Sequence, residues 1–182
     1  MLETGIRGKQ SVAVTPENTA KTMGSGTLNV FATPALVALA EKTCWMSVAD
    51  ALDEGCGSVG TKLELEHTAP TPVGMTVTCE SELTAVEGRK LVFKVSLYDE
   101  KGPVGGGVHE RFVVNDAKFA AKAESKKGMT VTCESELTAV EGRKLVFKVS
   151  LYDEKGPVGG GVHERFVVND AKFAAKAESK KG

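Results

Sequence analysis

A carboxylate on an apolar helix face is the most informative chemical feature of this chain. When residues 31–55 are placed on a helix at about 100° per residue, Glu41 falls near the middle of the apolar side. That side is formed by Val37, Cys44, Val48 and Leu52. Burial raises the pKa of a carboxyl group and costs free energy unless the group is paired, and such a group can serve as a general base or nucleophile. The alternative is that Glu41 lies at the helix edge or is paired within a subunit interface.

Thr33 and His67 are two further candidates. Thr33 is expected to cap the same helix, with Pro34 at the first helical position, and a helix N-terminus can polarise a carbonyl or hold an oxyanion. His67 shares the inward face of the strand predicted over 58–67. A cap alone would account for Thr33, and a core histidine for His67. Glu41 and His67 are the one acid and the one imidazole that periodicity turns inward before residue 75, which favours their convergence.

Arg111 and its copy Arg165 alternate with phenylalanines in a predicted strand, so they are expected to face away from the core. An outward arginine suits a phosphate-bearing ligand or is an ordinary surface charge. The run Gly105–Gly107 has no phosphate-loop pattern and predicts a bulge or a close approach of two backbones, either of which could shift the phase of Arg111.

Composition argues against several other function classes. The net charge of −1 gives no electrostatic case for nucleic acid or an anionic membrane surface. The four cysteines form no CxxC pair or Cys/His cluster, which argues against a zinc site or disulfide framework. No apolar run approaches the roughly 18 residues that a membrane span needs, and no secretory signal follows the first methionine. We therefore expect a cytoplasmic protein without a metal or other cofactor.

The elements that must position these side chains follow from the periodicity. A short strand is predicted over 9–16, a helix from Thr33 to Gly55, a strand over 58–67 and a three-stranded meander over 75–114. One long helix followed by an antiparallel run predicts an α+β fold in which the sheet wraps around the helix.

The chain also contains an exact repeat. Residues 75–128 and 129–182 are the same string, so the sequence reads as a domain over 1–128 followed by a second copy of its C-terminal block over 129–182. Copy one could complete the sheet and leave copy two as an extra meander, which shorter loop closure favours. Copy two could instead complete the sheet, or both could join it or swap between chains. The tail of each copy reads as a short helix or disorder.

The runs ATPALVALAE, SVGTKLELEHTAPTPVGMTV and VHERFVV resemble the hot-dog-fold thioesterases related to fluoroacetyl-CoA thioesterase. Thr33, Glu41 and His67 fall where that family has its catalytic threonine, glutamate and histidine. Gly60 and Arg111 match its active-site glycine and strand arginine, and Arg165 repeats Arg111.

The resemblance implies hydrolysis of an acyl-CoA thioester in a homodimer whose active sites lie at the subunit interface. Glu41 would act as base or nucleophile, Thr33 at the carbonyl, and His67 in orienting and sharing protons. Eight residues of helix span about 12 Å, so Thr33 and Glu41 reach one substrate only along the helix or with a second protomer.

The family's fluoroacetyl-specific member has phenylalanines that guard its pocket just before the catalytic threonine. Here that segment, residues 23–29, reads MGSGTLN, which favours a general short- or medium-chain acyl group. Two other interpretations remain: a hot-dog module that binds a thioester without catalysis, and an engineered duplication made to test fold plasticity.

Overall fold

The computed structural model describes residues 2–182, which divide into two compact units. The first unit contains the residues up to Ala117 together with Asp170–Gly182, and the second contains Lys118–Asn169. The expected boundary between residues 128 and 129 differs from this division. The tail of the first copy groups with the strands of the second copy, and the tail of the second copy groups with the first unit.

Within the described residues, the first unit is built on a five-stranded antiparallel sheet with the order β1-β3-β4-β5-β2. Its strands are β1 (Arg7–Ala13), β2 (Cys56–His67), β3 (Thr76–Glu87), β4 (Lys90–Asp99) and β5 (Gly102–Asn115). Tight turns join β3 to β4 and β4 to β5, and Gly88 and Gly102 adopt the positive φ that such turns require. The first copy of the repeat supplies β3, β4 and β5, so copy one completes the sheet, as the loop-closure argument favoured.

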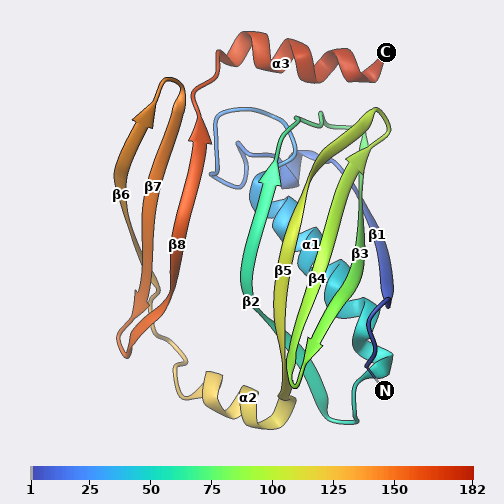
Figure 1. Cartoon of the computed structure of the whole chain (residues 1–182). Coiled ribbons are helices and arrows are strands. Elements are labelled where there is room, and N and C mark those ends of the chain that lie inside the picture. Colours follow the sequence, from blue (N-terminus) through green and yellow to red (C-terminus); the bar gives the residue numbers. More distant parts are fainter. Residues whose placement is uncertain (1) are drawn as a thin grey trace. The chain divides into compact units, whose positions relative to one another are not determined.

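Helix α1 (Thr33–Val48) lies across one face of this sheet, as Figure 1 shows, which confirms the predicted α+β arrangement. The helix cap was predicted wrongly. Ala32, in extended conformation, is the N-cap and Thr33 is the first helical residue. The Thr33 side chain bonds to His67 and caps no helix amide. The helix also ends earlier than Gly55, since the chain tightens into the 3₁₀ turn η2 (Ala49–Ala51).

The buried face of α1 agrees only in part with the one that the periodicity predicted, because Cys44 and Val48 are buried whereas Val37 and Leu52 are half-buried. Its buried residues are Leu36, Leu39, Ala40, Thr43, Cys44 and Val48. Thr43 was expected on the polar side but is buried. Its hydroxyl donates a 2.7 Å hydrogen bond to the Leu39 carbonyl, which removes the cost of burying an unpaired polar group. Glu41 therefore lies at the edge of the buried face, with 40% of its side chain exposed. The prediction failed because apolar residues surround the helix, including the exposed Trp45 and Met46.

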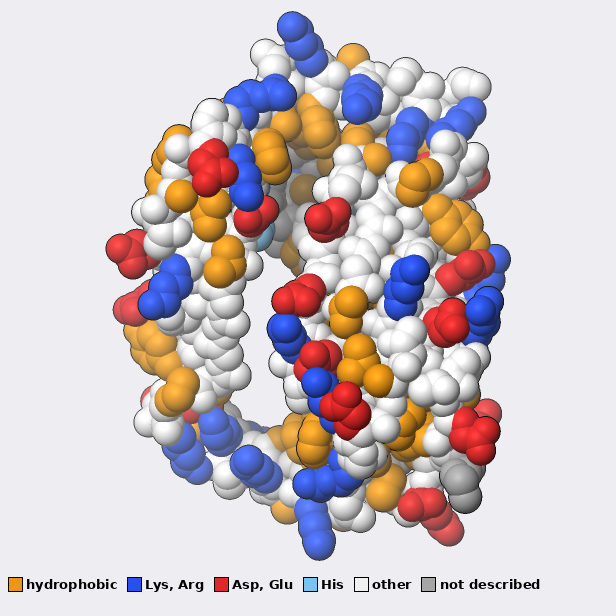
Figure 2. All heavy atoms as spheres, viewed as in Figure 1, with side chains coloured by type: hydrophobic (Ala, Val, Ile, Leu, Met, Phe, Trp, Pro, Cys, Tyr) orange, Lys and Arg blue, Asp and Glu red, His pale blue; other side chains and the backbone are white. Residues whose placement is uncertain are grey.

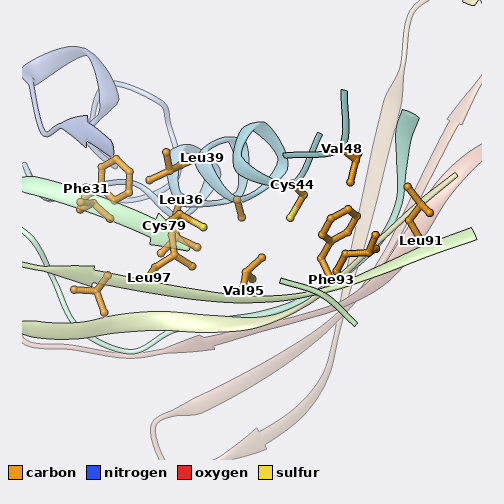
Figure 3. Close-up of a cluster of buried hydrophobic side chains, with 14 of the residues drawn as sticks. Phe31, Leu36, Leu39, Cys44, Val48, Cys79, Leu91, Phe93, Val95 and Leu97 are labelled. Carbon is orange, nitrogen blue, oxygen red and sulfur yellow. The ribbon is translucent and has the colours of Figure 1, made fainter. Parts of the chain in front are cut away.

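The core of the first unit lies between α1 and the sheet (Figure 3). Leu36, Cys44 and Val48 of the helix face alternate residues of the neighbouring strands. Those strand residues are Cys79, Leu91, Phe93, Val95 and Leu97. Phe31, just before the helix, is buried and its amide donates to the Thr71 carbonyl at 2.8 Å, which anchors the helix entrance.

The second unit, within its described residues, holds a three-stranded sheet with the order β6-β7-β8. Its strands are β6 (Thr132–Glu141), β7 (Lys144–Asp153) and β8 (Gly156–Phe166). Both copies of the tail are helical, as α2 (Asp116–Glu124) and α3 (Asp170–Glu178), and the 3₁₀ turn η3 (Ser179–Lys181) follows α3.

The second unit exposes more large apolar side chains than the first. On the second meander, apolar side chains are exposed, and Figure 2 shows hydrophobic atoms on its surface. The most exposed are Val131, Val140, Val162 and Phe166. Figure 2 shows acidic, basic and apolar side chains on the face of the first unit as well. Among residues 2–182, no helix is long and apolar enough to cross a membrane.

Candidate active site

Thr33 and His67 form the first of two polar clusters. Thr33 begins α1 and His67 ends β2, and their Oγ1 and Nδ1 atoms share a 3.0 Å hydrogen bond. The rings of His67 and Phe31 form a T-shaped pair, with centroids 6.5 Å apart and an interplanar angle of 74°. His67 Nε2 is buried and has no hydrogen-bond partner among the described residues. Burial lowers the pKa of His67, so the imidazole is neutral at neutral pH and its free nitrogen can take part in proton transfer.

Glu41 belongs to the second cluster, with Arg111 and His109 of β5. Its Oε1 lies 3.7 Å from His109 Nε2 and 3.8 Å from Arg111 Nη1. His109 Nδ1 lies 2.9 Å from the Lys62 carbonyl, which can only accept, so Nδ1 carries the proton. Nε2 of His109 is then the acceptor for Arg111 Nη1 at 3.0 Å. Burial, reinforced by the arginine charge, lowers the pKa of His109 and keeps it neutral.

The expectation that Arg111 faces away from the core was wrong. Arg111 is 5% exposed and points toward α1, as does His109, two residues earlier on the same face of β5. Its guanidinium is satisfied there, because Nε donates to Ser58 Oγ at 2.9 Å and Nη2 donates to the Ser58 carbonyl. The prediction assumed that the apolar residues of β5 face the core. Instead His109 and Arg111 face inward and Val108 is exposed. Arg165, by contrast, is exposed in the second unit.

His109 was not singled out from the sequence. The available signal was its i, i+2 spacing to Arg111, which places both side chains on one face of a strand.

Gly60 admits the Glu41 carboxylate to this cluster. A Cβ atom at Gly60 would overlap Glu41 Oε1 and lie 3.0 Å from His109 Cε1. Gly105–Gly107 serve a different purpose, since Cβ atoms at Gly105 and Gly107 would overlap the carbonyls of Glu66 and Glu64 in β2. The predicted close approach of two backbones is therefore confirmed at this run.

The two clusters lie at different positions along β2. Gly60 pairs with Arg111 and His67 with Gly105, seven residues further along, or about 23 Å at the rise of an extended strand. The convergence of Glu41 and His67 is therefore not found within one chain. A surface depression of about 450 Å³ beside the end of β2 is lined by residues other than Thr33, Glu41 and His67. Its lining is Glu64, Glu66, Thr68, Pro103 and Gly105–Gly107.

Comparison with known proteins gives consistent matches. The model of the fluoroacetyl-CoA-specific thioesterase family, FlK, matches residues 14–117 and, separately, 119–171. The fluoroacetyl-CoA thioesterase of Streptantibioticus cattleyicolor is 46% identical over 97 residues, which are 53% of this chain and 70% of that protein. A solved structure of the fluoroacetyl-CoA thioesterase FlK superposes with a TM-score of 0.66 at 38% identity, covering 70% of this chain and 98% of that one.

A hot-dog-like protein from Thermanaerovibrio acidaminovorans superposes with a TM-score of 0.62 at 25% identity, covering 69% of this chain and 93% of that one. The family model covers well over half of the chain, and the sheet wrapped over one helix is the architecture of the matched structures. The chain belongs to the fluoroacetyl-CoA-specific thioesterase family and is an acyl-CoA thioesterase of the hot-dog fold.

Proposed function

We propose that the protein hydrolyses short- or medium-chain acyl-CoA thioesters with Glu41 as the reactive carboxylate. The observation that carries this proposal is the Glu41 cluster. The Glu41 side chain is 40% exposed, so a substrate can reach it. Its Oε1 lies 3.8 Å from Arg111 Nη1, and the positive charge of that guanidinium orients the carboxylate. Gly60 leaves room for the carboxylate beside β2, because a Cβ atom there would overlap Glu41 Oε1.

In the reaction, a C–O bond forms at the thioester carbonyl and the C–S bond breaks. As a general base, Glu41 takes a proton from the attacking water, and the coenzyme A thiolate leaves and is protonated. As a nucleophile, Glu41 forms a mixed anhydride that water then hydrolyses. The Thr33 hydroxyl, held by His67, and the free amides at the start of α1 stabilise negative charge on the carbonyl oxygen.

The separation of the two clusters supports a homodimer with shared sites. β2 is an edge strand of its sheet, and its residues 60–64 are exposed. Antiparallel pairing of two copies of β2 about a two-fold axis between Leu63 and Glu64 would set Gly60 opposite His67 of the partner subunit. Glu41 of one protomer would then share a substrate with the partner's Thr33 and the partner's His67.

The segment before α1 supports the choice of acyl group. Residues 23–29 contain no aromatic side chain that could close over a small fluorinated acyl group. Fluoroacetyl-CoA selectivity belongs to the named relatives, and we propose a broader range of short and medium acyl chains for this protein.

The test is thiol release from a series of acyl-CoAs of increasing chain length, with fluoroacetyl-CoA included. Glu41→Gln keeps the shape of the side chain and should lower kcat by about 10²–10⁴. Glu54→Gln, an exposed acid beyond the same helix, is the matched control and should leave kcat unchanged. A chain that binds acyl-CoA without releasing thiol would favour the non-catalytic binding module instead.

A further inference from the structure

The two identical tails of this chain, residues 116–128 and 170–182, are buried to different extents. Phe119 is 45% exposed, whereas its copy Phe173 is half-buried. Ala123 is exposed, whereas its copy Ala177 is 1% exposed. Because the sequences are the same, the difference comes from what each tail contacts.

The tail over 170–182 belongs to the first unit and is held at both of its ends by earlier residues of that unit. Near its start, Asp170 Oδ2 accepts a 2.9 Å hydrogen bond from Thr27 Oγ1. Near its end, Lys180 Nζ lies 2.6 Å from Asp99 Oδ2, and Lys101 Nζ donates to the Gly182 carbonyl at 3.3 Å. We call the set Thr27, Thr71, Asp99 and Lys101 the tail slot.

Asp99 is the centre of the tail slot. Its side chain is fully buried, and the Lys180 side chain is only 17% exposed. Thr71 Oγ1 donates to Asp99 at 2.8 Å and the Lys101 amide donates at 2.9 Å. Burial alone would raise the pKa of Asp99, but Lys180 and these two donors outweigh it and lower the pKa. A buried carboxylate satisfied in this way is a built site for a cation.

The same ion pair occurs in the second unit with the two copies exchanged. There Lys126 Nζ, from copy one, lies 2.6 Å from Asp153 Oδ2, from copy two. Lys126 and Lys180 are the same position of the repeat, as are Asp99 and Asp153. Each lysine thus pairs with the aspartate of the other copy.

Strand geometry explains the exchange. Asp99 pairs with Gly102 at one end of β5, and the tail begins after Asn115 at the other end. The strand spans about 45 Å, whereas a helix of the length of α2 spans about 14 Å. A helical tail cannot return along β5 to the aspartate of its own copy.

We propose that the tail slot is a docking site for the C-terminal tail of a second copy of this repeat block, and that the duplication fills it within one chain. In a chain with a single block, a second chain would have to supply the tail. The charge of Lys180 also adds to burial in lowering the pKa of His67. The docking itself does not depend on the proposed hydrolysis.

The test measures binding of a dye-labelled peptide with the sequence of residues 170–182 to the full chain by fluorescence anisotropy. Lys180→Glu should empty the tail slot by repulsion from Asp99, whereas Lys126→Glu makes the identical change in the second unit, which lacks Thr27 and Thr71. The peptide should bind the Lys180→Glu chain at least about tenfold more tightly than either the Lys126→Glu chain or the unmodified chain.

A peptide in which alanine replaces the lysine equivalent to Lys180 should lose this binding. Circular dichroism and Trp45 fluorescence would show that both variants remain folded. Equal binding to the two variants, absent binding to both, or full binding of the alanine peptide would each overturn the proposal.

Discussion

The two copies of the repeat share one sequence and one hydrogen-bond register, yet they have different environments. Leu83 pairs with Phe93 in the first copy and Leu137 with Phe147 in the second, and in each copy the register shifts directly after this pair. Leu83 is fully buried, whereas Leu137 is 49% exposed, and Val104 and Val158 differ in the same way. Strand pairing and turns are therefore local properties of this block, whereas burial depends on what covers it.

Helix α1 is the element that makes the difference, because it covers the first meander. Over the first copy it buries the strands and brings Glu41 to Arg111 and His109. The copies of these two strand residues, His163 and Arg165, are exposed in the second unit. The same block thus forms part of a candidate catalytic cluster where α1 covers it, and an exposed apolar surface where α1 does not. The predictions below compare matched positions in the two copies.

Cysteine labelling should show the largest difference. Cys79 is fully buried, and burial raises its pKa to about 11, whereas its copy Cys133 is exposed. A thiol-specific reagent should label Cys133 at least about a thousandfold faster than Cys79, which must wait for opening of the fold. Cys133→Ser should remove the fast phase and Cys79→Ser should not. Similar rates at both positions would mean that the two copies exchange places in the sheet.

Cavity formation should be the next largest effect. Leu83→Ala leaves a void between α1 and the sheet and should lower the free energy of unfolding by about 2–5 kcal/mol. Leu137→Ala removes a half-exposed side chain and should cost less than about 1 kcal/mol. Urea denaturation followed by the fluorescence of Trp45, the single tryptophan, reports on the first unit. An equal loss for both variants would contradict the assignment of the first copy to the core.

The arginine pair should give a smaller effect on stability. Arg111→Ala leaves the Ser58 carbonyl and His109 Nε2 without their donor and should cost about 1–3 kcal/mol. Arg165→Ala changes an exposed position and should stay within about 0.5 kcal/mol. The same denaturation measurement applies, and thiol release should fall only for Arg111→Ala. A functional loss with Arg165→Ala would show that the second copy contributes to the site.

Acid should weaken the first unit through its buried histidines. The pKa values of His67 and His109 lie below the ordinary 6.5 chiefly because of burial, so the unfolded chain binds protons first as the pH falls. Their contribution to stability is complete above pH 6.5 and is lost as the pH falls toward the lowered values. Urea midpoints at pH 7.5, 6.5 and 5.5 should therefore decrease. His109→Gln should flatten this decrease more than His163→Gln, and an increase in stability toward pH 5.5 would contradict the burial of neutral histidines.

The general arrangement of this fold could be predicted from the sequence because it rests on local patterns. Alternation located the meander strands, and apolar periodicity with Pro34 located α1. The buried face of α1 could not be predicted, because apolar residues surround the helix and Thr43 satisfies its hydroxyl within the helix. Only packing against the sheet distinguishes these faces.

The candidate site was predicted in part for the same reason. Glu41 and His67 stand out by residue type, and the structure gives each a polar cluster. The i, i+2 spacing of His109 and Arg111 places them on one face of β5, but it does not show that this face turns inward. That depends on Ser58 and Lys62 in the neighbouring strand, which bind the two side chains. The exchange of tails between copies depends on the length of β5 and on a buried aspartate, and is visible only in three dimensions.

The central claim is that one working site combines Glu41 of one chain with Thr33 and His67 of another. The most direct test is to co-express Glu41→Gln and His67→Ala chains with different affinity tags and to purify the mixed dimer with both tags. Each variant alone should be inactive, whereas the mixed dimer keeps one intact site of two and should release thiol at about half the rate of the unmodified dimer. An inactive mixed dimer would contradict the claim, because it would show that each site draws all of its residues from one chain.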